Sequence, residues 1–411
     1  MKKIFKMLIL VFFLLTIFIY TLVVENIPSQ IIVFQGEDII FQTLLGINIK
    51  EKNSKIIETS SSIKNGVSQN IGKTELNLSL FDNISLKDIE VSVIPKTKVI
   101  PVGSIAGVKL YTNGVLVVGM SEIEGKDNKK YKPYENSGIK EGDTIIKIDE
   151  HEIDSTNDLI KTVNMSKGNN IKVKYIHDEE TKECSMTPIE TLSHEYKLGL
   201  WVRDSAAGVG TVTFYEPSTK TFGALGHGIT DIDTNELINI SSGEFITTRI
   251  LNITKGESGN PGKIQGSIEN QANIGLISKN SKFGIYGKVD NLSSLNIDTS
   301  KEMEVALRDE IHLGKATILC SLDNDKPKEY EIEIQNIYKE NNYDNKSMKI
   351  KVTDERLLEK TGGIIQGMSG SPIIQNGKFI GAVTHVLVNS PQEGYAVFGD
   401  IMLKQSKSIE K

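Results

Sequence analysis

The sequence predicts a mainly β protein that begins with a membrane-spanning helix and ends in a domain of small packed β-barrels. Three features lead to this prediction: an apolar run at the N-terminus, one amphipathic helix in the first half, and many short strand-like runs separated by turns in the second half. A chain of 411 residues is long enough for two or three domains that each bury a core.

The composition narrows the possible functions. The 47 basic and 53 acidic residues give a net charge of −6 and no basic footprint, so we do not expect nucleic-acid binding. The two cysteines, Cys184 and Cys320, are too few for a disulfide framework and have no metal-ligand spacing. We interpret them as buried thiols and leave a bridge between them open. No metal or other cofactor is predicted.

Residues 1–25 predict a transmembrane signal anchor. Lys2, Lys3 and Lys6 precede an uninterrupted apolar run from Met7 to Val24, about the length that crosses a bilayer as a helix. The lysines favour an N-terminus that stays in the cytoplasm and a body on the other side. A cleavable signal peptide is the alternative, but the segment after Tyr20 has no small-residue cleavage site.

Residues 26–95 predict a β-rich segment that contains a polar linker. Residues 47–73 are poor in large apolar side chains, which is typical of a linker or a mobile loop. Residues 75–95 alternate apolar and polar on both sides of Asp82-Asn83, the pattern of two strands joined by a turn.

Residues 96–188 predict a domain of mixed helix and strand. The stretch SGIKEGDTIIKID, which starts at Ser137, holds a turn and a strand. Ser155 and Asp158 then form a capping-box pattern before the apolar helical positions Leu159, Ile160 and Val163.

This stretch resembles the turn and strand motif of bacterial PDZ domains. The resemblance implies a groove between a strand and the helix, in which an extended peptide adds as an extra strand. It also implies that the loop that meets the carboxylate of the peptide lies near residues 102–108. A β-rich spacer without a ligand is the alternative.

Residues 189–411 predict a β domain with little helix. Short apolar runs such as GVGTVTFYE and KFIGAVTHVLV recur between turn signals, a pattern that indicates a sandwich or two small packed barrels. One short helix is predicted from Glu355 to Lys360.

The stretch GGIIQGMSGSPIIQNGKFIGAV, from Gly362 to Val383, holds a candidate nucleophile. Gly367 and Gly370 flank Ser369 and allow a tight turn. A serine needs a base that takes its proton and donors that stabilise the charge on the attacked carbonyl. The amides of Gly367 and Ser369 are the predicted oxyanion hole. An ordinary glycine-rich turn is the alternative.

His227 is the candidate base. It lies in TFGALGHGITD, framed by three glycines at the end of a short strand, where a side chain has room to face a cleft. His385, in GAVTHVLV, is the competing candidate because it follows the serine hairpin. Its strand alternation also fits a structural histidine within the barrel.

GALGHGITD and TGGIIQGMSGSPIIQNGKFIGAVTHVLVN resemble the SpoIVB peptidase (stage IV sporulation protein B) family of endospore-forming bacteria. The resemblance implies a chymotrypsin-like double β-barrel serine protease with His227 as general base and Ser369 as nucleophile. It places the acid that orients the histidine at Asp354. Asp231 is the alternative acid, and an N-cap of the following helix is the alternative role of Asp354.

The resemblance also implies a place of action. Members of this family act in the space between the two membranes that surround the forespore. There they cleave themselves and cut a membrane-bound regulator, which releases processing of the mother-cell sigma factor precursor (pro-sigma-K). The PDZ domain would bind a chain end, in another protein or in the protease's own N-terminal region, and the polar linker is the expected site of self-cleavage.

Two further expectations concern the substrate and the alternative function. Gly394, Tyr395 and Ala396 are expected to line the cleft, where related enzymes pair with the substrate backbone. The alternative function is a catalytically silent, membrane-anchored PDZ adaptor, which would bind peptides without cleaving them.

Overall fold

The structure is a computed structural model that describes residues 2–26, 29–35, 38–40, 47–52, 57–59, 65–68, 70–80, 83–178, 180–295, 297–324, 326–339 and 344–409. The chain divides into two compact units, Met1–Thr97 with Leu307–Ile311, and Lys98–Ala306 with His312–Lys411. Each unit is described by itself.

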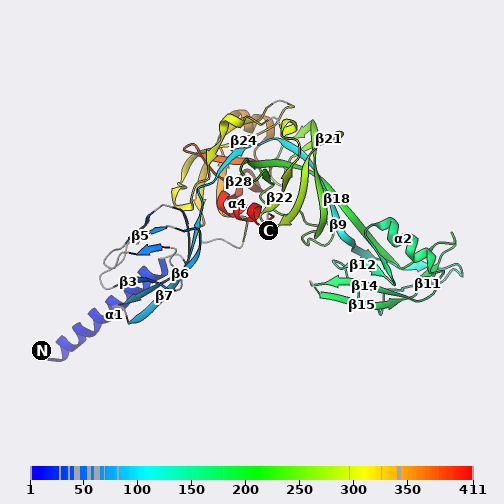
Figure 1. Ribbon diagram of the computed structural model, residues 1–411, viewed down its shortest axis with the longest axis horizontal. Helices are drawn as coiled ribbons and strands as arrows, with labels where there is room; N and C mark the ends of the chain where they lie inside the picture. The colour runs from blue at the N-terminus through cyan, green and yellow to red at the C-terminus, as the bar shows by residue number, and fades with distance from the viewer. Residues whose placement is uncertain are drawn as a thin grey trace. The chain divides into compact units, whose positions relative to one another are not determined.

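The first unit combines the N-terminal helix with small sheets (Figure 1). Its elements are α1 (Lys2–Asn26), β1 (Gln30–Phe34), β2 (Asp38–Ile40), β3 (Ile47–Glu51), β4 (Ile57–Thr59), β5 (Asn65–Ser68), β6 (Gly72–Leu80), β7 (Ile84–Ile94) and the 3-10 turn η3 (Arg308–Glu310). Within the described part of the chain, no helix combines the length and the apolar character needed to cross a membrane.

A four-stranded sheet in the order β1-β7-β6-β3 gives the first unit its core. Leu76 and Leu78 on β6 and Ile89, Val91 and Val93 on β7 lie two residues apart and are buried, because alternate side chains of a strand share one face. The strand pair predicted for residues 75–95 is present, although residues 81–82 lie outside the described residues.

The described residues within 47–73, which the sequence predicted to be a polar linker, form strands instead. They include β3, β4 and β5, and β3 pairs with β6 along five residues. Ile47 and Ile49 alternate with polar residues, which suits a half-buried strand despite the low apolar content. Residues 53–56, 60–64 and 69 of the expected linker lie outside the described residues.

The second unit contains two barrels and a smaller α+β domain. The first barrel is built from β9 (Ile105–Met120), β18 (Leu200–Glu216), β19 (Thr221–Ala224), β20 (Ile240–Thr254), β21 (Lys263–Ser281) and β22 (Gly284–Val289). They pair in the order β9-β20-β21-β22-β19-β18, and β18 pairs back with β9, so this six-stranded barrel is closed. Apolar side chains such as Val108, Phe222 and Phe245 fill it. The short strand β8 (Lys98–Pro101) pairs with β18 and with β23 (Met303–Glu304).

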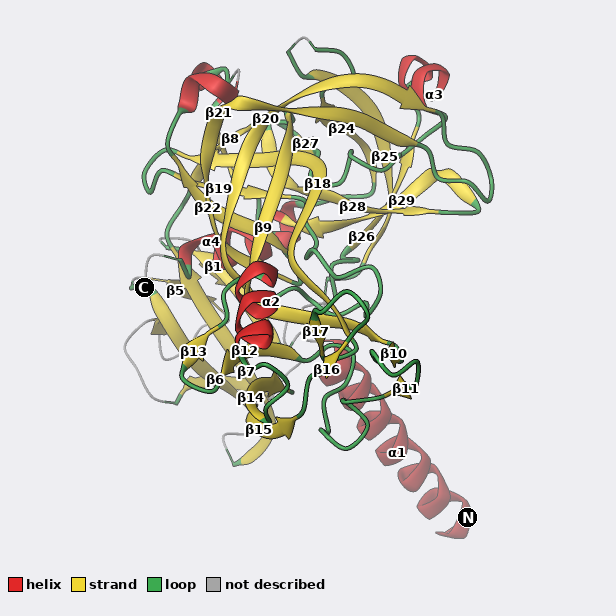
Figure 2. Ribbon diagram, turned by 90° about the vertical axis from the view of Figure 1, so that its right-hand side faces the viewer, coloured by secondary structure: helices red, strands yellow, loops and turns green. Residues whose placement is uncertain are grey.

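The second barrel is also six-stranded and closed, in the order β24-β25-β26-β29-β28-β27. Its elements are β24 (Gly314–Cys320), β25 (Lys328–Ile337), β26 (Met348–Val352), α3 (Glu355–Thr361), β27 (Pro372–Gln375), β28 (Lys378–Leu387), β29 (Ser390–Phe398) and the C-terminal α4 (Gly399–Lys407). The helix predicted from Glu355 to Lys360 is α3. The 3-10 turns η1 (Leu292–Leu295) and η2 (Thr299–Lys301) lie between the barrels in the chain, and Figure 2 shows how few helices accompany the strands.

The α+β domain is inserted between β9 and β18. Its elements are β10 (Ile123–Glu124), β11 (Lys130–Tyr131), β12 (Thr144–Ile148), β13 (His151–Glu152), α2 (Thr156–Met165), β14 (Ile171–His177), β15 (Glu180–Met186), β16 (Ile189–Glu190) and β17 (Tyr196–Lys197). Ser155 caps α2 by accepting from the amide of Asp158, as the capping box predicts. Leu159 and Val163 are buried, whereas Ile160 is exposed.

The boundaries of this domain differ from the expected 96–188 and 189–411. Residues 105–111 are barrel strand, because β9 pairs there with both β18 and β20, and β9 then continues to pair with β12 at Val115 and Leu116. One uninterrupted strand serves both domains, so the sequence carries no break at the boundary. Residues 105–108 of the predicted carboxylate loop lie in this strand, and the amides of Val102 and Gly103 donate to Thr213 and Val212 of β18, so the segment belongs to the barrel. Cys184 and Cys320 are unpaired, and Cys320 is fully buried.

Candidate active site

Ser369 lies in a tight loop between α3 and β27 that only glycine can form. Gly367 and Gly370 have φ of +101° and +96°, in the left-handed region. A Cβ at Gly370 would lie 2.2 Å from the carbonyl oxygen of Thr211. The amide of Gly370 donates to Val383 at 2.7 Å, which fastens the loop to β28.

The first barrel holds this loop through two contacts from Thr211 on β18. The Thr211 amide donates to the carbonyl of Ser369 at 3.1 Å, and its hydroxyl donates to the carbonyl of Gly367 at 2.7 Å. The Ser369 loop of one barrel is therefore positioned by a strand of the other.

The amides of Gly367 and Ser369 are available as an oxyanion hole. A trans peptide directs its C=O and N–H to opposite sides. The carbonyl of Gln366 accepts from Ile264 at 2.8 Å and that of Met368 from Ser371 at 2.9 Å, so the next N–H in each peptide points the other way. Within the described residues, neither amide donates to a protein group. Their role as an oxyanion hole stays a prediction.

His227 follows β19 in a turn that is left-handed at Leu225 and Gly226. Its Nδ1 lies 2.8 Å from the carbonyl oxygen of Gly228. A carbonyl only accepts hydrogen bonds, so Nδ1 carries the proton and the neutral ring keeps a lone pair on Nε2. Burial lowers the pKa of His227, and the contact with Gly228 opposes this only in part. The net effect leaves the ring neutral near pH 7, with Nε2 free to accept a proton.

Ser369 and His227 line one pocket of about 240 Å³, together with residues of β18 and Gly367. The pocket brings together the two residues that the sequence paired. Ser369 Oγ donates to the carbonyl of Thr384 at 2.8 Å in this structure. The hydroxyl proton therefore points to Thr384 and not to His227.

Asp354 does not contact His227 in the structure. It caps α3, accepts from the amides of Arg356 and Glu331, and forms an ion pair with Arg356 at 2.7 Å. The Arg356 side chain and these amides lower the pKa of Asp354 to about 2, against the effect of burial. The structure thus gives Asp354 the role of a helix cap, because a donor two residues away competes for its carboxylate.

Asp231, the alternative acid, is also engaged elsewhere. It is buried and forms an ion pair with Arg203. Burial raises the pKa of Asp231, but the amides of Asp233 and Thr234 and the charge of Arg203 bring it below the ordinary value. Neither predicted aspartate orients the histidine in this structure.

His385 on β28 lies against His227 instead. The two ring centroids are 5.3 Å apart and the rings are inclined by 36°. Both rings line a second pocket of about 590 Å³, whose wall also includes Lys282, Asp344 and Asn345. The sequence suggested His385 only as a competing base and gave no sign of Asp344 or Thr384.

Gly394, Tyr395 and Ala396 cannot pair with a substrate strand, contrary to expectation. They lie in β29, and Gly394 is paired with Ile350 of β26 on one side and Val386 of β28 on the other. Both edges are used because the barrel is closed. The available edge belongs to β28, whose pairing with β27 ends at Ala382.

The tip of the β20–β21 hairpin, residues 255–262, adjoins this edge. Gly259 donates its amide to Val388 at 2.9 Å, and Gly262 accepts from Gln366 at 2.8 Å. The tip therefore connects the segment that follows β28 with the residue that precedes the oxyanion hole.

A larger cavity of about 600 Å³ lies between α2 and the start of β18. Leu159, Ile160 and Val163 of α2 and residues 197–202 line it. The cavity is thus formed by the helix that the sequence predicted and by a strand that the sequence assigned to the next domain, and it is the candidate peptide groove. Trp201 is exposed there and donates to Ser121 at 3.0 Å.

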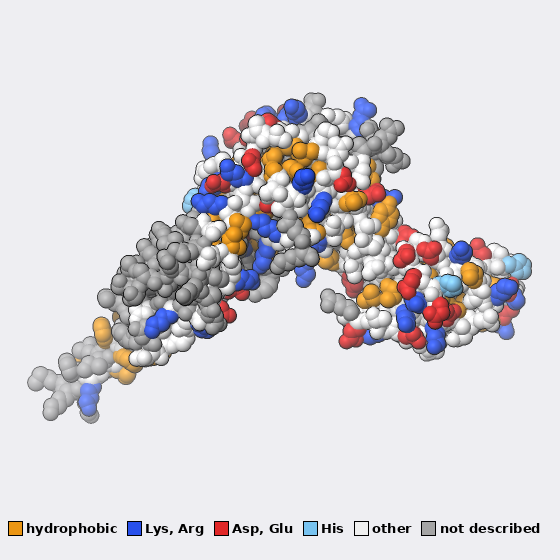
Figure 3. All heavy atoms as spheres, in the orientation of Figure 1, with side chains coloured by type: hydrophobic (Ala, Val, Ile, Leu, Met, Phe, Trp, Pro, Cys, Tyr) orange, Lys and Arg blue, Asp and Glu red, His pale blue; other side chains and the backbone are white. Residues whose placement is uncertain are grey.

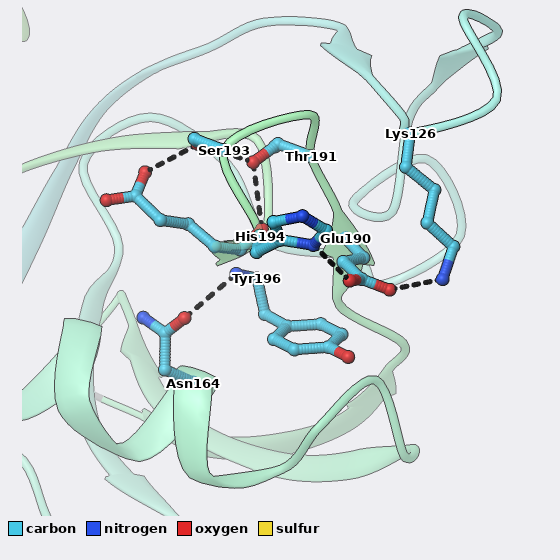
Figure 4. Close-up of polar contacts among 8 residues, drawn as sticks. Lys126, Asn164, Glu190, Thr191, Ser193, His194 and Tyr196 are labelled. Atoms are coloured by element: carbon cyan, nitrogen blue, oxygen red, sulfur yellow. Dashed lines mark hydrogen bonds and ion pairs between the residues drawn. The ribbon is translucent and has the colours of Figure 1, made fainter.

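Polar contacts fix the segment that leads into this groove (Figure 4). The amide of Tyr196 donates to Asn164 of α2 at 2.9 Å, and Glu190 contacts both Lys126 and His194. The hydrogen bond from Lys126, and then that from His194, lowers the pKa of Glu190. On the face shown in Figure 3, acidic and basic side chains are interspersed over this domain.

Two six-stranded barrels that share a Ser–His pocket, with an inserted PDZ domain, define a serine endopeptidase of the chymotrypsin type. The comparison with protein families makes the assignment specific. The chain belongs to the SpoIVB peptidase S55 family, whose model matches residues 194–403, and a PDZ domain model matches residues 107–187.

Solved structures resemble the chain only at low sequence identity. The PDZ domain of an SdrC-like protein from Listeria monocytogenes is 21% identical, with a TM-score of 0.18, over 22% of this chain and 87% of that one. The active form of Rv3671c protease from M. tuberculosis is 11% identical, with a TM-score of 0.27, over 61% and 85%. The HtrA-type protease AlgW with a decapeptide is 10% identical, with a TM-score of 0.30, over 75% and 65%. No curated protein matches the chain.

Proposed function

We propose that this protein is a membrane-anchored, self-cleaving endopeptidase of sporulation. It cuts a membrane-bound regulator in the space between the two forespore membranes and so triggers processing of the mother-cell sigma factor precursor (pro-sigma-K). Membership of the SpoIVB family supports the sporulation role. The observation that carries the proposal is that Ser369, His227 and Gly367 line one pocket, and that the Gly367 amide donates to no protein group among the described residues.

The proposed reaction follows from the positions of these groups. Nε2 of His227 takes the proton of Ser369 Oγ, and the oxygen attacks the carbonyl carbon of the peptide bond. The amides of Gly367 and Ser369 stabilise the oxyanion. The His227 imidazolium then protonates the leaving amine, and water, activated by the same histidine, hydrolyses the acyl-enzyme.

We propose that the substrate pairs with the open edge of β28. Thr384 and Val388 both use their carbonyls on that edge, for Ser369 and Gly259 respectively. Because a strand repeats every two residues, the N–H and C=O of Val386 face the same side. An extended substrate would form its backbone hydrogen bonds with Val386, next to the nucleophile.

We propose that α1 anchors the protein in the forespore membrane and leaves the body outside the cytoplasm. Its apolar side chains are exposed on all sides, as a membrane would require; they include Ile4, Met7, Leu10, Val11, Phe12, Phe13, Leu14, Leu15, Ile17 and Phe18. Self-cleavage between residues 25 and 100 would release the body. The groove beside α2 would bind a chain end, either of a partner or of the protease's own N-terminal region.

The experiment compares the full chain in lipid vesicles as wild type, Ser369→Ala and His227→Ala. Each protein is treated with a fluorophosphonate probe, and the released fragments are sequenced by mass spectrometry. Labelling and a new N-terminus within residues 25–100 in the wild type alone support the proposal. Folded wild type that neither reacts nor cleaves itself would identify a silent PDZ adaptor instead.

A further inference from the structure

The pocket that Ser369 and His227 share has an apolar wall that the proposed reaction does not use. The wall belongs to the first barrel and includes Val108, Ala206, Gly208, Leu225 and Ile229. Gln366 and Gly367, which precede Ser369 in its loop, complete the lining on the other side. No Lys, Arg, Asp or Glu is among the described residues that line the pocket, so an apolar surface lies directly beside Ser369 and His227.

Gly208 leaves this pocket open. It pairs with Val108, whose side chain lies in the core of the barrel, and paired residues of neighbouring strands point to the same face. Gly210, two residues further along β18, shares that face, and a Cβ there would overlap the side chain of Leu225. A Cβ at Gly208 would meet nothing within 4 Å. The barrel is therefore hollow at the end beside Ser369 because position 208 has no side chain.

This Gly208 hollow has the size and the character of a site for one apolar side chain. Its volume of about 240 Å³ is smaller than the roughly 300 to 1,000 Å³ of sites that hold a whole small molecule. Val108 and Leu225 are buried, so the floor is a fixed part of the barrel core. An aliphatic side chain gains by leaving water for such a surface, whereas a charged side chain would lose its hydration without finding a partner.

The position of His227 decides which side of the cut bond supplies this side chain. In the proposed reaction, protonated His227 gives its proton to the leaving amine, so the residue that carries this amine lies beside the histidine ring. The acyl side of the substrate follows the open edge of β28 in the proposed binding mode. No residue of β28 is among the described residues that line the hollow, whereas His385 of β28 lines the other pocket that His227 borders.

We propose that the Gly208 hollow is the subsite for the first residue of the leaving fragment, and that it selects valine, isoleucine, leucine or methionine there. Gly208 is the specificity-determining residue of this subsite, because any side chain at position 208 would occupy the space that the substrate side chain needs. The inference rests on the proposed endopeptidase function and on His227 as its base.

The test determines the residues on both sides of the bonds that the full chain cuts in lipid vesicles. The probe is a mixture of peptides from a digest of an unrelated bacterial proteome. Cuts are read by mass spectrometry as new peptide ends that Ser369→Ala does not produce. In the wild type, we expect aliphatic residues to begin the new fragments at least about threefold more often than their abundance in the mixture predicts, and charged residues to be depleted.

Three variants connect this preference to the hollow. Gly208→Val fills it, Gly208→Ala fills it in part, and Ser242→Val adds the same valine at an exposed position of β20 in the same barrel. In Gly208→Val, cuts before Leu and Met should fall about tenfold relative to cuts before Gly and Ala, and in Gly208→Ala by less. The residues preferred on the acyl side should not change. Ser242→Val should match the wild type on both sides of the cut.

Three results would overturn the inference. The first is a set of Ser369-dependent cuts without a preference for aliphatic residues at this position, and the second is a preference that both Gly208 variants leave unchanged. The third is a change on the acyl side in place of the leaving side, which would assign the hollow to the other fragment. If the folded wild type makes no Ser369-dependent cut, the proposed function itself is refuted, so the two failures are distinguishable.

Discussion

Thr211 of the first barrel donates its hydroxyl to the carbonyl oxygen of Gly367 in the second barrel at 2.7 Å. The peptide that carries this carbonyl directly follows the Gly367 amide of the oxyanion hole. One side chain therefore couples the two barrels next to the predicted oxyanion hole. This contact leads to the first prediction.

Thr211→Val should slow fluorophosphonate labelling by about 10- to 100-fold, because the oxyanion loop loses a bond that positions it. The matched control is Thr213→Val. Thr213 lies two residues further on the same strand, and its buried hydroxyl has no partner among the described residues. Replacing an unpartnered buried hydroxyl is neutral or stabilising. Equal labelling in the two variants would show that the contact does not matter for the site.

Asp354→Asn should destabilise the fold and leave catalysis nearly intact. The Asp354 pKa is about 2 in the folded protein, below its ordinary value, so its stabilising effect is present above about pH 4 and is lost as the pH falls toward 2. The variant loses an ion pair with Arg356, and because the Arg356 side chain is largely exposed we expect only a modest loss of stability.

Urea unfolding from pH 2 to 7 and labelling at pH 7 check this prediction together. The stability difference between wild type and variant should shrink as the pH falls. A labelling rate that dropped a thousandfold, in protein that is still folded, would show that Asp354 orients His227 in the working enzyme.

Gly370→Ala should destabilise the fold by about 3 kcal/mol or more and abolish labelling. The added methyl would lie 2.2 Å from the Thr211 carbonyl oxygen and 2.5 Å from the amide nitrogen of Leu225, and neither backbone group can move freely. Gly377→Ala is the control. Its φ is +74° and nothing lies within 4 Å of the added carbon, so only backbone strain of about 1 kcal/mol is expected. Thermal unfolding of both variants tests the comparison.

Peptide binding to the groove should change the intrinsic fluorescence of the protein. Trp201 is the only tryptophan in the sequence and lines the cavity beside α2. A peptide with a free carboxyl end should shift its emission, and Ile160→Asp should weaken that response about tenfold or more. Leu251→Asp, on an exposed apolar residue of β20, is the control. A full response in Ile160→Asp would place the ligand elsewhere.

Removing Ser369 and His227 together should cost no more activity than removing either alone, because they act as one unit. Self-cleavage of the double variant, measured beside both single variants, checks this expectation. A further loss in the double variant would indicate that each residue contributes by an independent route.

Ser369, His227 and Gly367, which the sequence singled out, line one pocket, and the glycines beside them are what made these positions recognisable in the sequence. Gly367, Gly370 and Gly226 have a left-handed backbone conformation. Their spacing around Ser369 and His227 can be recognised in the sequence alone. The role of Asp354 could not be predicted from the sequence. A carboxylate before a helix suits a triad or a cap equally well, and only the position of Arg356 decided in favour of the cap in this structure.

The remaining differences between the sequence-based prediction and the structure arise at strands that pair with two partners, either in two domains or on both edges. The alternation of β9 continues from the barrel into the PDZ domain, so no composition change marks the boundary. Gly394 to Ala396 follow the serine hairpin closely in sequence, but barrel closure uses both of their edges. Closure of a barrel depends on strands that are far apart in the sequence, so local sequence patterns cannot predict it.

The insertion of the PDZ domain between two barrel strands has a topological consequence. Met120 at the end of β9 and Leu200 at the start of β18 are paired neighbours, so the segment between these two strands begins and ends at adjacent positions. β9 and β18 form one β-hairpin, and the PDZ elements between them take the place of its loop. A protease nick inside it would leave both fragments attached through β9 and β18. A single short turn between Met120 and Leu200 would remove most of the domain without opening the barrel.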